Sequence, residues 1–111
     1  MVDIKIDLKE ANELPVIEVT GEVDVYTAPK LKSRILSLID NQQYSMIIDL
    51  NGVDFMDSSG LGVLVGGLKR VGPHEGNIAL VLNRPNILKI FKITGLDKVF
   101  KIYGSVEEVP K

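Results

Sequence analysis

The sequence predicts a small α/β domain whose sheet is mixed and mostly parallel, with an antiparallel hairpin at its N-terminal edge and about four helices. Apolar and charged residues alternate over 2–8, which indicates a half-buried strand. Short apolar runs at 46–50 and 78–82 are typical of strands covered on both faces. Residues at helical spacing separate these runs. Helices between buried strands imply right-handed crossovers and parallel pairing.

The first half of the chain supplies the hairpin, a helix and the central strand. A polar turn at 11–13 joins the first strand to a second one at 15–20. Thr27 is expected to cap the following helix. Pro29 suits the first turn of that helix, where the missing N–H of proline costs little. The central strand is expected to run over 46–50 and to end in a turn at Asn51-Gly52. A short crossing segment should follow.

The second half repeats the alternation of helix and strand. Asp57, Ser58 and Ser59 are residue types that cap helices, and the helix they open is closed by Gly72-Pro73. After the strand at 78–82, Pro85 opens a third helix and Gly95 is a natural residue to end it. A last strand is expected within 99–103. The capping-box pattern of 105–108 predicts a terminal helical turn.

Composition limits the function classes. With 111 residues the chain is long enough for one domain, 1–111, but too short for two. A net charge of −2 and scattered Lys and Arg argue against a nucleic-acid binder. The absence of cysteine excludes disulfides and thiolate chemistry. The N-terminus lacks a leader-like apolar region and no run approaches the ~20 apolar residues that span a bilayer. We therefore expect a cytoplasmic protein without a membrane role.

Two kinds of site, a serine hydrolase triad and a metal site, are poorly matched. A nucleophile elbow needs glycine two residues before its serine, but Met56 precedes Ser58 at that position. His74, the only histidine, is expected to be a solvated loop residue without a partner. No cluster of ligands for a metal ion is apparent. These observations favour a protein that is not an enzyme and holds no metal.

A nucleotide site is a weaker alternative. Glycines at 60, 62 and 66 resemble a dinucleotide loop, but ten positions separate Gly60 from the expected strand end at Leu50. No Walker lysine lies in the loop. No cofactor is therefore expected, and a nucleotide-binding module stays the less favoured hypothesis.

What remains is a serine that can be modified at a helix N-terminus. The helix dipole and the free N–H groups favour a phosphate there. Such a group adds nearly two negative charges beside Asp57 and blocks the approach of a partner. The residues alone leave capping and modification equally open for Ser58 and Ser59.

Two motifs carry a resemblance to a known family. Residues 55–63, FMDSSGLGV, resemble the signature of bacterial anti-sigma-factor antagonists, the stand-alone STAS-domain proteins. Residues 21–24, GEVD, resemble that family's Gly-Glu-Leu/Val-Asp motif at the end of its second strand. The resemblance covers the whole chain in length, element order and the register of both motifs.

The resemblance implies a phosphorylation switch. An unphosphorylated antagonist would bind an anti-sigma factor that is also a serine kinase and so free the sigma factor. The kinase would phosphorylate the first serine of the motif, here Ser58, and a PP2C-type phosphatase would reverse this. We expect a monomer or weak dimer that regulates transcription. A scaffold subunit of a larger signalling assembly is the alternative function with the same domain.

The expected partner-binding surface combines both motifs, because the carboxyl ends of parallel strands share one edge of a sheet. Its members are Glu22, Asp24, Tyr26, Thr27, Asp57, Ser58, Ser59, Gly60 and Gly62. Asp24 is expected to pair with an arginine of the kinase, and a turn carboxylate is its alternative role. Gly60 and Gly62 would admit a partner's backbone. Gly66 and Gly67 are expected to pack on the sheet, with partner contact as the alternative.

Overall fold

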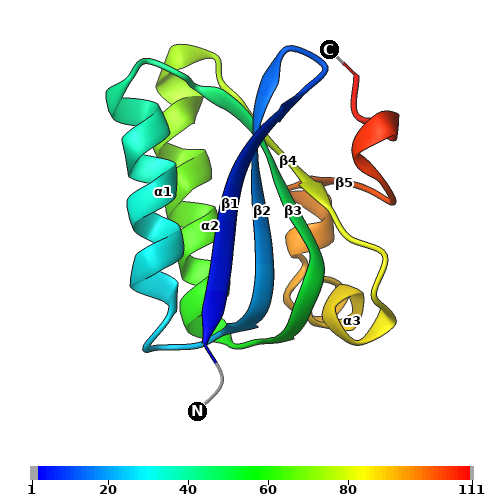
Figure 1. Cartoon of the computed structure of the whole chain (residues 1–111). Helices are drawn as coiled ribbons and strands as arrows, with labels where there is room; N and C mark the ends of the chain where they lie inside the picture. Colours follow the sequence, from blue (N-terminus) through cyan, green and yellow to red (C-terminus); the bar gives the residue numbers. More distant parts are fainter. Residues whose placement is uncertain (1–2, 111) are drawn as a thin grey trace.

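The computed structural model describes residues 3–110 and shows one α/β domain (Figure 1). The described residues form three α-helices, five strands and three short 3₁₀ turns. In chain order the elements are β1 (Ile4–Ala11), β2 (Leu14–Val23), α1 (Ala28–Asp40), β3 (Ser45–Met56), α2 (Ser58–Val71), η1 (Gly72–His74), β4 (Asn77–Val81), α3 (Pro85–Thr94), η2 (Leu96–Lys98), β5 (Lys101–Tyr103) and η3 (Val106–Glu108). Val2, expected in the first strand, lies outside the described residues.

The sheet has the predicted mixed topology. Its strands lie in the order β1-β2-β3-β4-β5, with β1 antiparallel to β2 and every other pair parallel. A two-residue turn joins β1 to β2, and both of its residues have positive φ, Asn12 at 54° and Glu13 at 66°. This backbone matches the twist of a hairpin. The predicted fold class is confirmed.

The expected turn at Asn51-Gly52 is wrong, and so is the crossing segment after it. β3 continues to Met56, because its pairing with β2 continues from Thr20 opposite Gly52 to Val23 opposite Met56, with one shift in register after Gly21. Asn51 does not form a turn. Its side chain forms hydrogen bonds with two segments that are remote in sequence. Its side chain accepts a hydrogen bond from the Asn83 amide at 2.7 Å and donates one to the Gly104 carbonyl at 3.2 Å.

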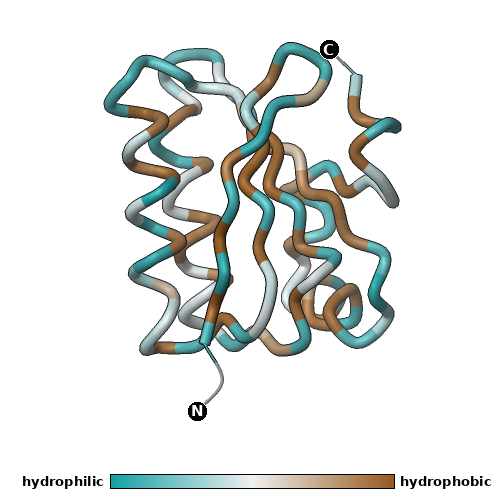
Figure 2. Tube along the Cα trace, in the orientation of Figure 1, coloured by the Kyte–Doolittle hydropathy of each residue, from teal (hydrophilic) through white to brown (hydrophobic). Residues whose placement is uncertain are grey.

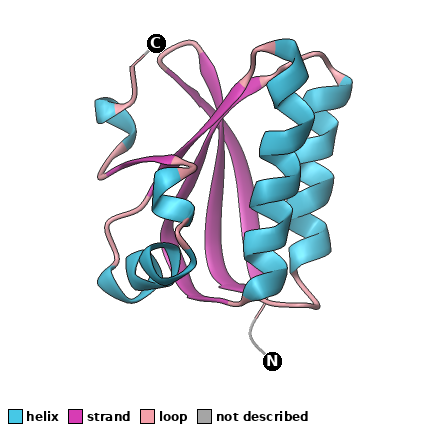
Figure 3. Cartoon of the chain, turned by 180° about the vertical axis from the view of Figure 1, so that it is seen from behind, coloured by secondary structure: helices cyan, strands magenta, loops and turns pink. Residues whose placement is uncertain are grey.

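The helices lie on both sides of the sheet. Figures 1 and 3 show α1 and α2 side by side on one face and α3 on the other. Apolar residues concentrate along the strands, as Figure 2 shows. The main core includes Ile48, Leu64 and Phe91, and a smaller cluster around Ile47 and Val109 packs on the face that the C-terminal segment covers. Among the helices of residues 3–110, none is both long enough and apolar enough to cross a bilayer.

Most of the expected helix boundaries are confirmed. Pro29 and Pro85 lie in the first turns of α1 and α3. Gly95 ends α3 with a left-handed φ of 76°. The capping box around Ser105 is present, but the helical turn that it opens is the 3₁₀ turn η3. The fold therefore has three α-helices, and η3 takes the place of the fourth.

Position 21 requires glycine because of its backbone conformation and its close neighbours. Its φ is 108°, and an added Cβ would collide with the main-chain oxygen of Asp3, the residue before β1. Residues other than glycine rarely adopt such a φ. This glycine opens the GEVD motif, so it fixes how β2 leads into the loop that follows.

We expect Gly21→Ala to destabilise the fold by about 2 kcal/mol or more, because the methyl group adds a backbone clash to the conformational strain. Gly95→Ala is the matched control. Gly95 also has positive φ, but its Cβ would meet open space. That variant should lose only about 1 kcal/mol. Urea denaturation compares the two, and equal losses would show that the clash at Gly21 is unimportant.

Candidate functional site

The two sequence motifs meet at the carboxyl edge of the sheet, as expected. Val23 is paired with Met56, and the Asp57 amide donates a hydrogen bond to the Val23 carbonyl at 3.2 Å. The loop before α1 and the first turn of α2 therefore emerge from adjacent strand ends. We call this region, residues 22–27 and 54–62, the tip.

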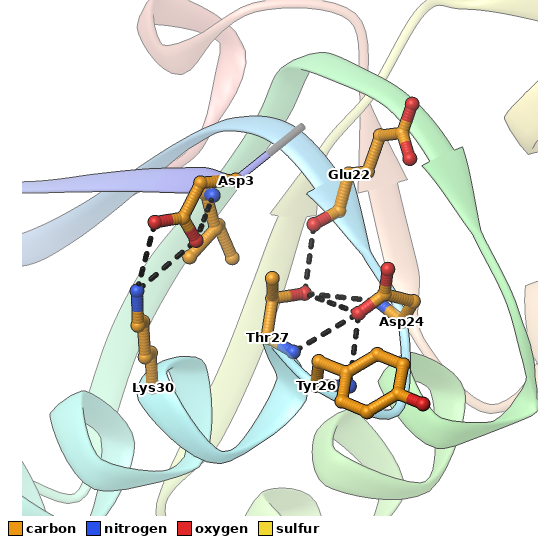
Figure 4. Close-up of polar contacts among 7 residues, drawn as sticks. Asp3, Glu22, Asp24, Tyr26, Thr27 and Lys30 are labelled. Carbon is orange, nitrogen blue, oxygen red and sulfur yellow. Dashed lines mark hydrogen bonds and ion pairs between the residues drawn. The ribbon is translucent and has the colours of Figure 1, made fainter. Parts of the chain in front are cut away.

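The loop between β2 and α1 is organised by Asp24 and Thr27 (Figure 4). The Asp24 Oδ1 atom accepts hydrogen bonds from the Tyr26 amide at 2.9 Å and the Thr27 amide at 3.0 Å. Thr27 is buried, and its hydroxyl donates to the Glu22 carbonyl at 2.8 Å and accepts from the Asp24 amide at 2.9 Å. These bonds hold the loop in one conformation.

This arrangement corrects the expected role of Thr27. Thr27 is the residue before α1, but its side chain makes no capping hydrogen bond to the helix. Its hydroxyl is used instead to close the loop onto Glu22 and Asp24. With only 4% of its surface exposed, Thr27 offers little area for contact with a partner and holds the loop from within.

The first turn of α2 leaves Ser58 available. Asp57 is the N-cap, and its Oδ1 atom accepts a hydrogen bond from the Ser59 amide at 2.9 Å. Capping, one of the two roles left open for Ser58 and Ser59, is therefore performed by Asp57. Ser58 is exposed and Ser59 half-buried, and neither hydroxyl has a hydrogen-bond partner within residues 3–110. Of the two serines, Ser58 is the more accessible.

The two glycines of the second motif differ in their surroundings. Gly60 is buried, and a Cβ there would lie 2.7 Å from Val23 Cγ1 and 2.9 Å from Met56 Cγ. The expected approach of a partner's backbone at Gly60 is wrong, because the chain's own strands occupy that space. Gly62 is exposed with open space beside it, so it remains available.

Sequence reasoning missed the apolar residues of the tip. Val25 is 60% exposed, Tyr26 85% and Phe55 47%. Only Tyr26 was expected at the binding surface. Phe55 lies in β3 opposite Glu22, in the segment for which the sequence predicts a crossing rather than a strand. The sequence did contain a signal for Val25. An apolar residue in an otherwise polar turn is not part of an apolar pattern, which indicates that its side chain is exposed.

Negative charges surround these apolar residues. Glu22 and Asp57 are half-buried residues, and Figure 4 shows the carboxylate of Glu22 extending away from the loop. Asp54 forms an ion pair with Arg84 at 3.1 Å. At the margin of the tip, the Ile4 amide and the Lys30 ammonium hold the pKa of the Asp3 carboxyl below its usual value.

The tip lacks the residues of a histidine-dependent catalytic site or a metal site. His74 follows the far end of α2, which is 14 residues long or about 20 Å. His74 is exposed, as expected of a solvated residue, and its ring stacks on Tyr44 with ring centroids 3.8 Å apart. In residues 3–110, no group of three or more His, Cys, Asp or Glu residues could hold a metal ion.

The spacing argument against a nucleotide loop is wrong. β3 ends at Met56 rather than Leu50, so Gly60 follows the strand by four positions and not by ten. The packing of Gly60 against Val23 and Met56 gives a better argument. A phosphate cradle needs glycines whose backbone can be approached, and this one is covered.

We expect Asp24→Ala to lower the free energy of unfolding by about 1 to 2 kcal/mol, because two loop amides lose their acceptor. Asp24→Asn retains an oxygen at the same place, so it should stay within about 0.5 kcal/mol of the wild type. Urea denaturation of the two variants measures the difference. An alanine variant as stable as the asparagine variant would contradict a structural use of this side chain.

Comparison with known proteins agrees with these features. Residues 5–109 match the family model of the STAS domain. The anti-sigma-B factor antagonist of Bacillus subtilis is 34% identical over 106 residues, which cover 96% of each chain. A crystal structure of an anti-sigma factor antagonist from Mycobacterium paratuberculosis superposes with a TM-score of 0.87 at 29% identity, over 96% of this chain and 90% of that one. The structure of the Bacillus cell fate determinant SpoIIAA in its phosphorylated form superposes with a TM-score of 0.72 at 25% identity. The match covers 94% of this chain and 95% of that one. The chain belongs to the STAS-domain family of anti-sigma factor antagonists.

Proposed function

We propose that the unphosphorylated chain binds an anti-sigma factor with serine kinase activity and thereby frees its sigma factor. Phosphorylation of Ser58 by that kinase switches the chain off, and a PP2C-type phosphatase restores it. ATP belongs to the kinase, so this chain acts by binding and not by catalysis. The observation that carries the proposal is an exposed serine at the start of α2, on a tip that also carries exposed apolar side chains.

The local structure supports Ser58 as the acceptor. Its hydroxyl is exposed and free of hydrogen bonds to the described residues, so a kinase can reach it. The cap of α2 is Asp57, so modifying Ser58 removes no helix-capping interaction. The positive end of the helix dipole favours added negative charge. A solved relative in a phosphorylated form supports the same type of chemistry.

The composition of the tip supports a protein partner. Exposed aromatic side chains such as Tyr26 and Phe55 are the residue types that contribute most to protein–protein affinity. Carboxylates beside them can pair with arginine or lysine of the partner. The free Oδ2 atom of Asp24 is suited to this, since only Oδ1 is used within the described residues. Asp24 thus has a structural use and a proposed binding role.

Phosphorylation acts in this proposal through charge and bulk at the contact surface. A phosphoserine carries nearly two negative charges beside Asp57 and occupies space that a neutral hydroxyl leaves open. Like-charge contacts and steric exclusion across an interface can cost several kcal/mol. Since about 1.4 kcal/mol is a factor of ten, a loss of affinity on the order of a hundredfold is expected.

The first test maps the modification. The chain is incubated with ATP and the serine-kinase anti-sigma factor of the same organism, then digested with trypsin. The peptide 35–69 contains both serines of the motif. Fragment ions should place one phosphate on Ser58. Ser58→Ala should bind the kinase but accept no phosphate, whereas Ser59→Ala should still be modified. A phosphate on Ser59 would overturn the assignment.

The same samples test the mechanism. Circular dichroism of the phosphorylated and unphosphorylated proteins should nearly superimpose, because Ser58 neither caps the helix nor packs in the core. Titration calorimetry should show the loss of affinity. A large loss of helix signal would show that the switch acts by unfolding α2 instead.

The second test concerns the apolar surface. Tyr26→Ala should weaken binding of the unphosphorylated chain to the kinase by about tenfold or more, because an exposed aromatic anchor is lost. Its melting temperature should stay near that of the wild type, since Tyr26 is 85% exposed. Ile93→Ala is the matched control: Ile93 is 74% exposed but lies on α3. Equal affinities for both variants would remove Tyr26 from the surface.

A further inference from the structure

A groove runs between α1 and α2 on the side away from the sheet. The two helices lie side by side (Figures 1 and 3). The hollow between them has a volume of about 230 Å³. The residues that matter to the argument are Lys32, Leu36, Gly62, Val63, Gly66 and Arg70. We call this hollow the α1–α2 groove.

The groove is open because two of the glycines that line it have no side chain to fill the space and no neighbour close by. A Cβ added at Gly67 would lie 3.1 Å from Ile78 Cδ1 and 3.2 Å from Ile35 Cγ2. The expectation that this glycine packs closely on the sheet is therefore confirmed. A Cβ added at Gly62 or Gly66 would meet no atom within 4 Å. The same expectation is wrong for Gly66, which costs the helix about 1 kcal/mol without any close packing in return.

The two helices that form the groove differ in the sign of their charge from the whole chain. The helices α1 and α2 contain five basic residues and one acidic residue, a formal charge of 5 − 1 = +4, while the chain as a whole has −2. Lys32 and Arg70 flank the apolar side chains of Leu36 and Val63. Neither cation forms an ion pair with residues 3–110. The groove is therefore apolar along its walls and positively charged at its margins.

The dimensions of the groove indicate what kind of ligand it can take. Small-molecule sites usually have volumes of roughly 300 to 1,000 Å³, so this hollow suits one or two side chains better than a cofactor. From Gly62 to Arg70 the helix advances about 12 Å, slightly more than two turns. A short amphipathic helix has this reach, with apolar side chains one turn apart on one face.

We propose that the α1–α2 groove binds an acidic amphipathic helix of a protein partner. One or two of its apolar side chains lie against Leu36, Val63 and the open faces of the glycines. Its carboxylates pair with Lys32 and with the guanidinium of Arg70, which can accept a carboxylate in a bidentate manner. The groove begins one helical turn after Ser58, yet the inference does not depend on the Ser58 switch.

The test uses a synthetic helical peptide with two leucines one turn apart and glutamates on either side of them. The peptide is titrated into the isotope-labelled protein, and amide resonances are followed by NMR. Shifts of Gly62, Gly66 and Gly67 should saturate with a dissociation constant below about 1 mM. The same peptide with glutamine in place of glutamate should bind several-fold more weakly. If the acidic peptide does not shift the amide resonances of these glycines at concentrations well above about 1 mM, the proposal is overturned.

Variants separate binding from folding. Gly66→Leu fills the groove with a side chain that meets no atom near its Cβ, so it should weaken the acidic peptide about tenfold while the melting temperature stays equal or rises. Gly72→Ala is the matched control, because Gly72 also faces open space but lies beyond the end of α2. A normal affinity of Gly66→Leu would overturn the proposal.

A charge exchange identifies the class of partner. The double variant Lys32→Glu with Arg70→Glu should lose the acidic peptide and gain a peptide that carries lysines in place of the glutamates. Vesicles of anionic phosphatidylglycerol are the competing probe, since a basic pair of helices could also contact a membrane surface. The wild type should not sediment with them. Sedimentation that the double variant abolishes, without peptide binding, would assign the surface to lipid and overturn the proposal.

Discussion

The parallel pairing of β2 with β3 is the constraint on which the tip depends. The two strands stay paired from Val16 opposite Ile47 to Val23 opposite Met56, although the register shifts twice. Because the pairing continues to the last residue of each strand, the GEVD loop and the start of α2 leave the sheet side by side. The hydrogen bond from the Asp57 amide to the Val23 carbonyl joins them directly. Residues more than thirty positions apart in sequence thus form one surface.

The sequence was sufficient for the architecture because its signals are regular. Alternation in the first strand, apolar runs in the buried strands and proline or glycine at helix ends each report a local preference that the structure obeys. Asn51-Gly52 shows where this fails. Its local preference for a turn is outweighed by continued pairing with β2 and by the hydrogen bonds of the Asn51 side chain to Asn83 and Gly104. Both partners are remote in sequence, so no local pattern could report them.

The site was predictable in position but not in detail. The motifs placed the tip correctly, yet the division of roles within it depends on side-chain directions that composition does not reveal. Thr27, a capping residue by type, closes a loop, and Asp57 alone caps α2. The glycines show the same limit: Gly21 permits a positive φ, Gly60 and Gly67 permit close packing, and Gly66 leaves a groove open. These roles look identical in the sequence.

If Ser58 is the switch that we propose, the arrangement at the start of α2 separates the stability of the helix from signalling. If Ser58 were the N-cap, phosphorylating it would alter the interaction that begins the helix, and the switch would act on folding as well as on binding. In this structure Asp57 supplies the cap through the Ser59 amide, and Ser58 occupies the next position with its hydroxyl exposed. The helix dipole there favours additional negative charge, whereas the neighbouring carboxylate opposes it. In the proposed switch, Ser58 could therefore be phosphorylated and dephosphorylated without unfolding the chain, because its exposed hydroxyl contributes nothing to the core.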